Sequence, residues 1–165
     1  MGTGGLFLRK LRARVSDEPT GFVWVEEGRL AGSGYPASRT QVKWLADLGI
    51  RGILTLTPEP LPSDWTKGLG LTLGHVAMKD HEAPSVDAMT KGVNFITAQL
   101  REERPVVVHC LAGEGRTGCV LAAFLITERH IGGEEALKAL RMAKPQFVER
   151  AQERSIYDYA QAMKL

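Results

Sequence analysis

The stretch Val106–Gly118, VVVHCLAGEGRTG, decides the fold of this 165-residue chain. Three consecutive β-branched residues predict a buried strand, and the glycines after it predict a tight turn. The apolar pattern that follows Arg116 predicts a helix. A turn between a strand and a helix can point successive backbone N–H groups inward, and the helix adds the positive end of its dipole. We therefore expect an anion-binding loop at residues 110–116.

Two side chains of this loop suggest chemistry beyond binding. Cys110 lies at the mouth of the loop, where inward N–H groups stabilise a thiolate over a neutral thiol, and the thiolate is the nucleophilic form of cysteine. Arg116, six positions later, offers a planar fork of donors that matches two phosphate oxygens. Thr117 can place a hydroxyl near the sulfur and help it leave a covalent intermediate. The bound group would be lined by Leu111, Ala112, Gly113, Glu114, Gly115 and Arg116.

Strand and helix patterns alternate along the rest of the chain. The predicted strands are 22–25, 29–33, 53–57, 71–78 and 105–108, and the predicted helices are 38–48, 85–103, 117–130, 134–143 and 149–164. This alternation predicts an α/β fold. We expect a single domain with a central, mostly parallel sheet of four or five strands flanked by helices.

The composition limits the function classes. The 44% hydrophobic content suffices for one core, and the net charge of +2 resembles no nucleic-acid-binding tail. No apolar run approaches the ~20 residues of a membrane span, and the first residues lack the apolar core of a signal peptide. Two cysteines form neither a disulfide framework nor a four-ligand zinc site. We expect a cytoplasmic monomer with no metal, cofactor or nucleic-acid partner.

Residues 1–20 are expected to form an arm in front of a catalytic domain at 21–165. The arm combines apolar residues at 6–8 with basic Arg9, Lys10, Arg12 and Arg14, and a breaker-rich run follows at 17–21. A surface helix or a partly disordered extension is the simpler interpretation. Docking to an acidic partner or a membrane surface is the alternative.

The loop from His109 to Gly118 resembles the signature of the protein tyrosine phosphatase superfamily. Residues 22–163 resemble the small atypical dual-specificity phosphatases of the VH1-like member Z type, with further matches at 22–25, 28–32, 45–50 and 54–57. The resemblance implies a shallow, permissive site that hydrolyses phosphotyrosine, and also phosphoserine and phosphothreonine, through a phosphocysteine intermediate. Its partners would be phosphorylated proteins or peptides.

The resemblance also implies a general acid and a water-positioning group. Asp80, thirty residues before Cys110, occupies the position of the family's general-acid aspartate, although His81 and Glu82 differ from the related sequences. A helix cap or a solvated turn residue is the alternative for Asp80, and Asp87 should face away. Water would be positioned by Glu149, Gln152 or Glu153, which could equally be surface residues; the glutamine falls one place earlier than in the relatives.

Other interpretations of the loop are phosphoinositide or RNA 5′-phosphate hydrolysis and a non-catalytic phosphate-binding module. Glu114 stands where lipid phosphatases of this superfamily tend to have lysine, and a carboxylate there would repel additional phosphates. Cys110, Arg116 and Asp80 are all present, which argues against a non-catalytic module. We expect His109 to hold the loop through a hydrogen bond and Cys119 to be a small buried apolar residue.

Overall fold

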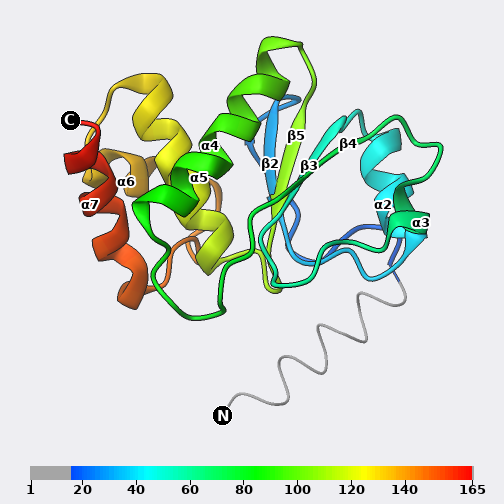
Figure 1. Cartoon of the computed structure of the whole chain (residues 1–165), viewed down its shortest axis with the longest axis horizontal. Coiled ribbons are helices and arrows are strands. Elements are labelled where there is room, and N and C mark those ends of the chain that lie inside the picture. Colours follow the sequence, from blue (N-terminus) through cyan, green and yellow to red (C-terminus); the bar gives the residue numbers. More distant parts are fainter. Residues whose placement is uncertain (1–15, 165) are drawn as a thin grey trace.

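The computed structural model describes residues 16–164, so the expectations for the arm up to residue 15 lie outside the described residues. Within this part of the chain, five strands form one sheet in the order β1-β2-β5-β3-β4 (Figure 1). The strands are β1 (Val23–Glu26), β2 (Leu30–Ser33), β3 (Gly52–Thr55), β4 (Thr72–His75) and β5 (Val106–His109). Only β1 runs antiparallel to its neighbour, so the mostly parallel sheet expected from the sequence is confirmed.

Helices cover both faces of the sheet (Figure 1). On one side lie α2 (Arg39–Asp47) and the short α3 (Ser63–Thr66); on the other lie α4 (Val86–Arg101), α5 (Gly115–Arg129), α6 (Gly133–Ala143) and α7 (Glu153–Ala162), with the 3-10 turn η1 (Arg150–Gln152) before α7. The single α/β domain is therefore as predicted. The sequence pattern missed α3, and the strand expected at 71–78 is regular only from Thr72 to His75.

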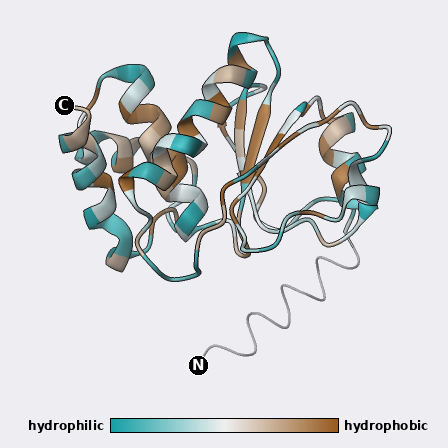
Figure 2. Cartoon of the chain, viewed as in Figure 1, coloured by the Kyte–Doolittle hydropathy of each residue, from teal (hydrophilic) through white to brown (hydrophobic). Residues whose placement is uncertain are grey.

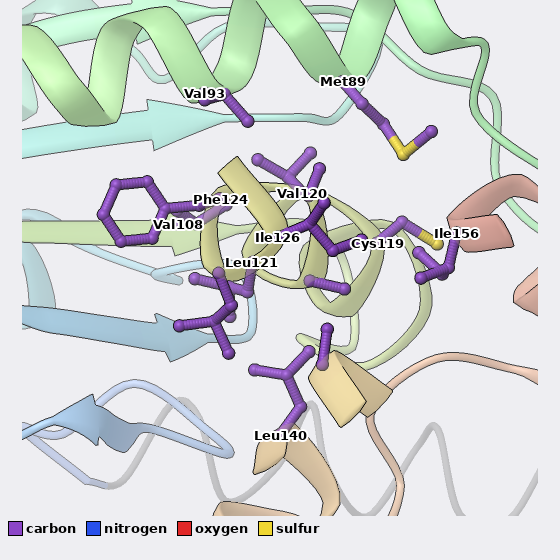
Figure 3. Close-up of a cluster of buried hydrophobic side chains, with 14 of the residues drawn as sticks. Met89, Val93, Val108, Cys119, Val120, Leu121, Phe124, Ile126, Leu140 and Ile156 are labelled. Carbon is purple, nitrogen blue, oxygen red and sulfur yellow. The ribbon is translucent and has the colours of Figure 1, made fainter. Parts of the chain in front are cut away.

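Helix α5 is buried on all sides, from Gly115 to Ile126. Figure 3 shows Val120, Leu121 and Phe124 of α5 within a cluster that also receives Met89 from α4 and Leu140 from α6. A helix that is apolar around its whole circumference belongs in the interior of a domain. Because its neighbours surround α5, the loop that enters its N-terminus is held in one position.

A second apolar cluster fills the space under α2. Figure 2 shows apolar residues concentrated in the central strands, with mixed faces on the outer helices. Trp24 and Trp44 pack against this cluster, and each ring meets Phe22 edge-on at centroid distances of 5.3 and 5.2 Å.

Among residues 16–164, no helix is long and apolar enough to cross a membrane.

The start of α4 offers a test of the local physics next to the segment that contains Asp80. The Ser85 hydroxyl accepts a hydrogen bond from the Ala88 N–H at 3.1 Å and so caps the helix. We expect Ser85→Ala to lower the free energy of unfolding by about 1 kcal/mol, since one helix N–H loses its acceptor. Urea denaturation measures the change. Ser85→Asp restores an acceptor and should stay within about 0.5 kcal/mol of the wild type; an equal loss in both variants would contradict the cap.

Candidate active site

The loop between β5 and α5 is held by hydrogen bonds to its carbonyl groups. The Tyr35 N–H donates to the Leu111 carbonyl at 3.0 Å, and the Lys144 ammonium donates to the Gly113 carbonyl at 3.0 Å. The N–H of a trans peptide points opposite to its C=O, and no cis peptide occurs in the described residues. The N–H groups of Ala112 and Glu114 therefore point away from these donors, as an anion-binding loop requires.

His109 holds the loop at its start. Its Nδ1 lies 3.3 Å from the Cys110 carbonyl oxygen, and its Nε2 lies 2.8 Å from Oγ1 of Thr55. A carbonyl oxygen only accepts, so Nδ1 carries the proton and the threonine hydroxyl donates to Nε2. Burial lowers the pKa of His109 to about 4; the hydrogen bond to the Cys110 carbonyl opposes this shift, and the positive charge of Arg116 adds to it. The ring is therefore neutral at pH 7, and the expected holding contact is present.

Gly113 is required by the backbone of the loop. Its φ is +72°, and a Cβ there would lie 2.3 Å from the backbone carbon of Ser33. Gly115 is restricted for a different reason, because a Cβ on it would lie 2.6 Å from Oε1 of Gln152. The two glycines let the loop approach two other segments closely. Of the remaining loop residues, Cys110 is buried at the end of β5 and Leu111 is 42% exposed.

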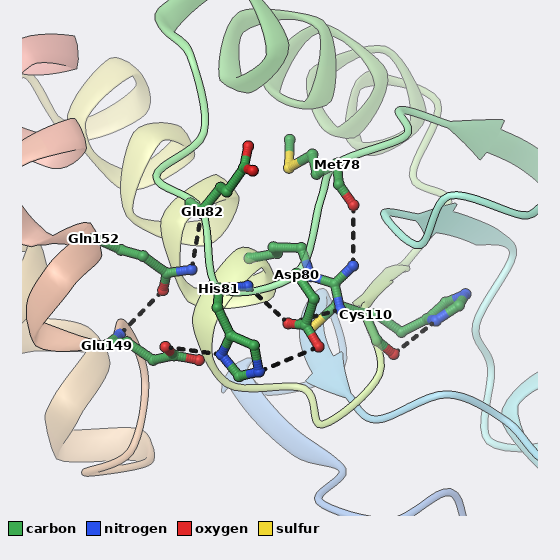
Figure 4. A network of polar contacts seen from close by, with 9 residues as sticks. Met78, Asp80, His81, Glu82, Cys110, Glu149 and Gln152 are labelled. Carbon is green, nitrogen blue, oxygen red and sulfur yellow. Dashed lines mark hydrogen bonds and ion pairs between the residues drawn. The ribbon is translucent and has the colours of Figure 1, made fainter.

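Arg116 lies in the first turn of α5 and is only 2% exposed. Its Nη1 donates to the Met78 carbonyl at 3.0 Å, and its Nη2 pairs with Oδ1 of Asp80 at 3.1 Å (Figure 4). Within residues 16–164, Nε of Arg116 and Oγ1 of Thr117 are buried without a hydrogen-bond partner. Buried polar atoms rarely lack a partner, so both suit a site that receives an oxygen-rich anion.

Asp80 lies in the turn after β4 and reaches the loop through this ion pair. Its Oδ1 also accepts the His81 N–H at 3.0 Å, so the carboxylate stabilises its own turn as well. The side chain is 43% exposed, which leaves it accessible to solvent. Asp87 pairs with Lys91 at 3.0 Å along α4. The structure thus brings Asp80 to the loop and gives Asp87 a different partner.

Two of the three expected water-positioning residues lie beside the loop. Glu149 and Gln152 form a reciprocal capping box at η1, and a Cβ on Gly115 would contact both side chains. Glu153 instead pairs with Arg141 at 2.6 Å, and this arginine also donates to the Val148 carbonyl. The geometry therefore favours Glu149 and Gln152 for this role, and Glu153 supports the preceding turn.

Sequence reasoning missed the contributions of Lys144 and His81. Lys144 joins the loop to the chain before β1 by donating to the carbonyls of Gly113 and Gly21. Nothing in the local sequence around a lysine before Pro145 indicates such a contact.

The expectation for Cys119 is confirmed: it is fully buried in α5, and burial raises the pKa of its thiol to about 12.

This arrangement of a cysteine, a glycine-rich anion loop and a buried arginine defines the class of cysteine-dependent phosphatases. The family model described as "PTP-SAK: Swiss Army Knife protein, DSP-PTPase phosphatase domain" matches residues 19–156, and the chain belongs to this family. The family is a subset of the protein tyrosine and dual-specificity phosphatases, in agreement with the resemblance found in the sequence. Residues 19–156 therefore form a domain of the cysteine-dependent phosphatase class.

Three relatives place the chain within this class. It is 29% identical over 126 residues to phosphatidylglycerophosphate phosphatase PTPMT1 of Arabidopsis thaliana, covering 73% of this chain and 37% of that protein. It is 32% identical over 101 residues to human dual specificity protein phosphatase 9, covering 61% and 26%. The chain thus spans about a third of the length of these curated relatives. The crystal structure of Tk-PTP in the active form superposes with a TM-score of 0.76 at 26% identity, over 86% of this chain and 96% of that chain.

The buried ring of His109 predicts a specific loss of stability in acid. Its folded pKa of about 4 lies below the ordinary 6.5, so the unfolded chain binds more protons between these values. The stabilisation of the folded state by the neutral ring is complete above pH 6.5 and is lost as the pH falls towards 4. The free energy of unfolding should therefore decrease by about 2–3 kcal/mol between pH 7 and pH 4.5 from this group alone.

The prediction is tested by urea unfolding of His109→Asn at pH 7 and pH 4.5. We expect the decrease in unfolding free energy between these pH values to be smaller than in the wild type by about 2 kcal/mol. His130→Asn, which changes an exposed histidine, should keep the full decrease. The same pH dependence in all three proteins would show that His109 titrates normally.

Proposed function

We propose that this chain hydrolyses phosphotyrosine in proteins or peptides, and also phosphoserine and phosphothreonine, with Cys110 as nucleophile, Arg116 as phosphate clamp and Asp80 as general acid. The observation that carries the proposal is the buried guanidinium of Arg116, which contacts the Asp80 carboxylate while its Nε has no partner among residues 16–164. A phosphate monoester supplies oxygens for this guanidinium and for the N–H groups of the loop.

In the first step, the Cys110 thiolate attacks phosphorus and a sulfur–phosphorus bond forms as the ester oxygen–phosphorus bond breaks. The leaving oxygen takes its proton from Asp80. Substrate phosphate would compete with Asp80 for Nη2 of Arg116, and its negative charge would favour the protonated form of the nearby carboxyl group. Binding of the substrate thus prepares the acid for its task.

In the second step, water attacks phosphorus, the sulfur–phosphorus bond breaks, and Asp80 accepts a proton from the water. The departing sulfur is a thiolate again, stabilised by the loop N–H groups and by the hydroxyl of Thr117. Glu149 and Gln152 lie beside Gly115, where their oxygens can orient the water. The balance of the cycle is one ester and one water converted to one alcohol and one phosphate.

The charges around the loop favour a substrate with a single phosphate. The carboxylates of Asp80 and Glu149 belong to the polar network at the loop, and Glu114 lies within the loop itself. Such a surface repels ligands that carry several phosphates. A phospholipid substrate is the second candidate, because the name of the Arabidopsis relative specifies phosphatidylglycerophosphate.

Initial rates on phosphotyrosine, phosphoserine and phosphothreonine peptides, compared with rates on phosphatidylglycerophosphate and an inositide phosphate, distinguish these substrates. The highest kcat/KM is expected on the phosphotyrosine peptide. A higher kcat/KM on either lipid phosphate would replace the protein substrate with a lipid one and leave the mechanism in place.

Cys110→Ser should abolish turnover, since a serine hydroxyl stays protonated at neutral pH and is a poor nucleophile in that form. Less than about 1% of the wild-type kcat is expected. Vanadate should still bind, because the loop N–H groups and Arg116 are unchanged, and isothermal calorimetry measures this. Cys119→Ala is the matched control and should remain active. Activity above the stated limit in Cys110→Ser would remove Cys110 as the nucleophile.

Asp80→Asn should show an effect that depends on the leaving group. A tyrosine phenolate needs a proton more than an activated nitrophenolate does, and general acid catalysis contributes about 10²- to 10⁴-fold. We therefore expect a decrease in kcat within this range on phosphotyrosine peptide and a much smaller decrease on an activated aryl phosphate. An equal factor on both substrates, with an unchanged pH profile, would contradict the assignment of Asp80.

A further inference from the structure

The imidazole of His81 lies between two carboxylates from separate segments (Figure 4). Its Nδ1 is 3.3 Å from Oε2 of Glu149, and its Nε2 is 3.5 Å from Oδ2 of Asp80. The side chain is 76% exposed, so its protonation follows the solvent pH. His81 therefore links the turn that contains the proposed general acid to the segment before η1.

The two contacts require a particular protonation state. An ionised carboxylate only accepts hydrogen bonds, and a neutral imidazole has a single N–H, whereas an imidazolium has two. Only the imidazolium can donate to Glu149 and at the same time form an ion pair with Asp80. The surroundings of the ring favour this form. The hydrogen bond to Glu149 is the largest cause that raises the pKa of His81 above 6.5, and the negative charges of Asp80 and Glu149 raise it further. Desolvation and the positive charge of Arg116 oppose the shift.

A second contact ties the same two segments together. Nε2 of Gln152 donates to the Glu82 carbonyl at 3.2 Å, and Gln152 is itself fixed by the capping box with Glu149. His81 adopts φ +60°, a left-handed conformation that non-glycine residues adopt at some cost. The turn at residues 80–82 is therefore anchored at two points, one permanent and one that depends on a proton.

We propose that His81 is a positioning residue whose doubly protonated ring holds the turn at residues 80–82 against the Glu149–Gln152 segment, and so keeps Asp80 beside the Cys110 loop. The inference rests on the proposed function, because it concerns the placement of the general acid. Loss of one proton removes the positive charge that attracts both carboxylates, so the contact of the ring to Glu149 weakens. The turn then depends more on the bond from Gln152, and Asp80 spends less time in position.

The test compares two histidines that share an unusual backbone conformation. His81 and His130 are both exposed and have φ values of 60° and 54°, and asparagine tolerates this conformation. We expect His81→Asn to lower kcat/KM on phosphotyrosine peptide by about 3- to 10-fold at pH 6 and by less than about 2-fold at pH 8. His130→Asn should match the wild type at both pH values.

A permanently charged side chain at the same position provides a rescue. Arginine has several N–H donors and stays protonated at pH 8, so His81→Arg should restore the rate at pH 6 and reduce its decline towards pH 8. The inference is overturned if His81→Asn has the same pH profile as His130→Asn, or if it is faster than the wild type at pH 6. A wild type that hydrolyses no phosphate ester refutes the proposed function, and the inference with it; a normal rate that is independent of His81 refutes the inference alone.

Nuclear magnetic resonance of the full chain adds a readout that needs no activity. The titration midpoint of the His81 ring protons should lie above 6.5 in the wild type and move towards 6.5 in Glu149→Gln, since the largest cause of the shift is removed. The midpoint of His130 should not move. An unchanged His81 midpoint in Glu149→Gln would show that the ring does not bind Glu149, and the inference would fail.

Discussion

The guanidinium of Arg116 is almost completely removed from solvent, and an isolated buried charge would cost several kcal/mol. Its neutralisation therefore determines which segments meet at the site. The Met78 carbonyl and the Asp80 carboxylate both belong to the segment that follows β4. This segment must therefore pass close to the first turn of α5. The ion pair that lets arginine be buried also places a carboxylate beside the loop. Folding and the chemistry of the site thus depend on the same contact.

The position of this contact depends on how α5 is packed. The helix is surrounded by α4, α6, α7 and the sheet, so its first turn has a fixed position relative to β5. Small displacements of reacting groups have large effects on rate. The loop between β5 and α5 is also held from outside, by the Tyr35 N–H and the Lys144 ammonium. The apolar core therefore fixes the frame of the site, and a few polar contacts fix the directions of its N–H groups.

The parts of the molecule that could be predicted from the sequence are those determined locally. The strand, glycine turn and helix at residues 106–129 are specified by neighbouring residues, and so is the left-handed φ of Gly113; the close approach of Gly113 to Ser33 is not. Glu153 could not be distinguished from Gln152 in the same way, because its pairing with Arg141 depends on how α6 packs against α7. Lys144 and His81 were missed for the same reason, because each contacts a residue that is distant in sequence. Glu149 lies 68 positions from His81, and Gly21 lies 123 positions from Lys144, so only the folded structure shows that they meet. The aspartate was found only through a family resemblance, since a single carboxylate in a turn has no local signal.

The charges of the site explain why a protonated histidine beside the proposed general acid need not oppose it. A positive ring near Asp80 favours the ionised carboxylate, which would weaken an acid that must give up a proton. The ring of His81, however, makes its hydrogen bond to Glu149, whereas its contact to Asp80 is a longer ion pair, so its charge is shared between the two carboxylates. Substrate phosphate would add negative charge on the other side of Asp80 and draw Arg116 away from it. Phosphate binding would then weaken the ion pair between Arg116 and Asp80, while the contact of His81 to Glu149 still holds the turn in place. A histidine placed between two carboxylates can therefore position the acid without keeping it ionised.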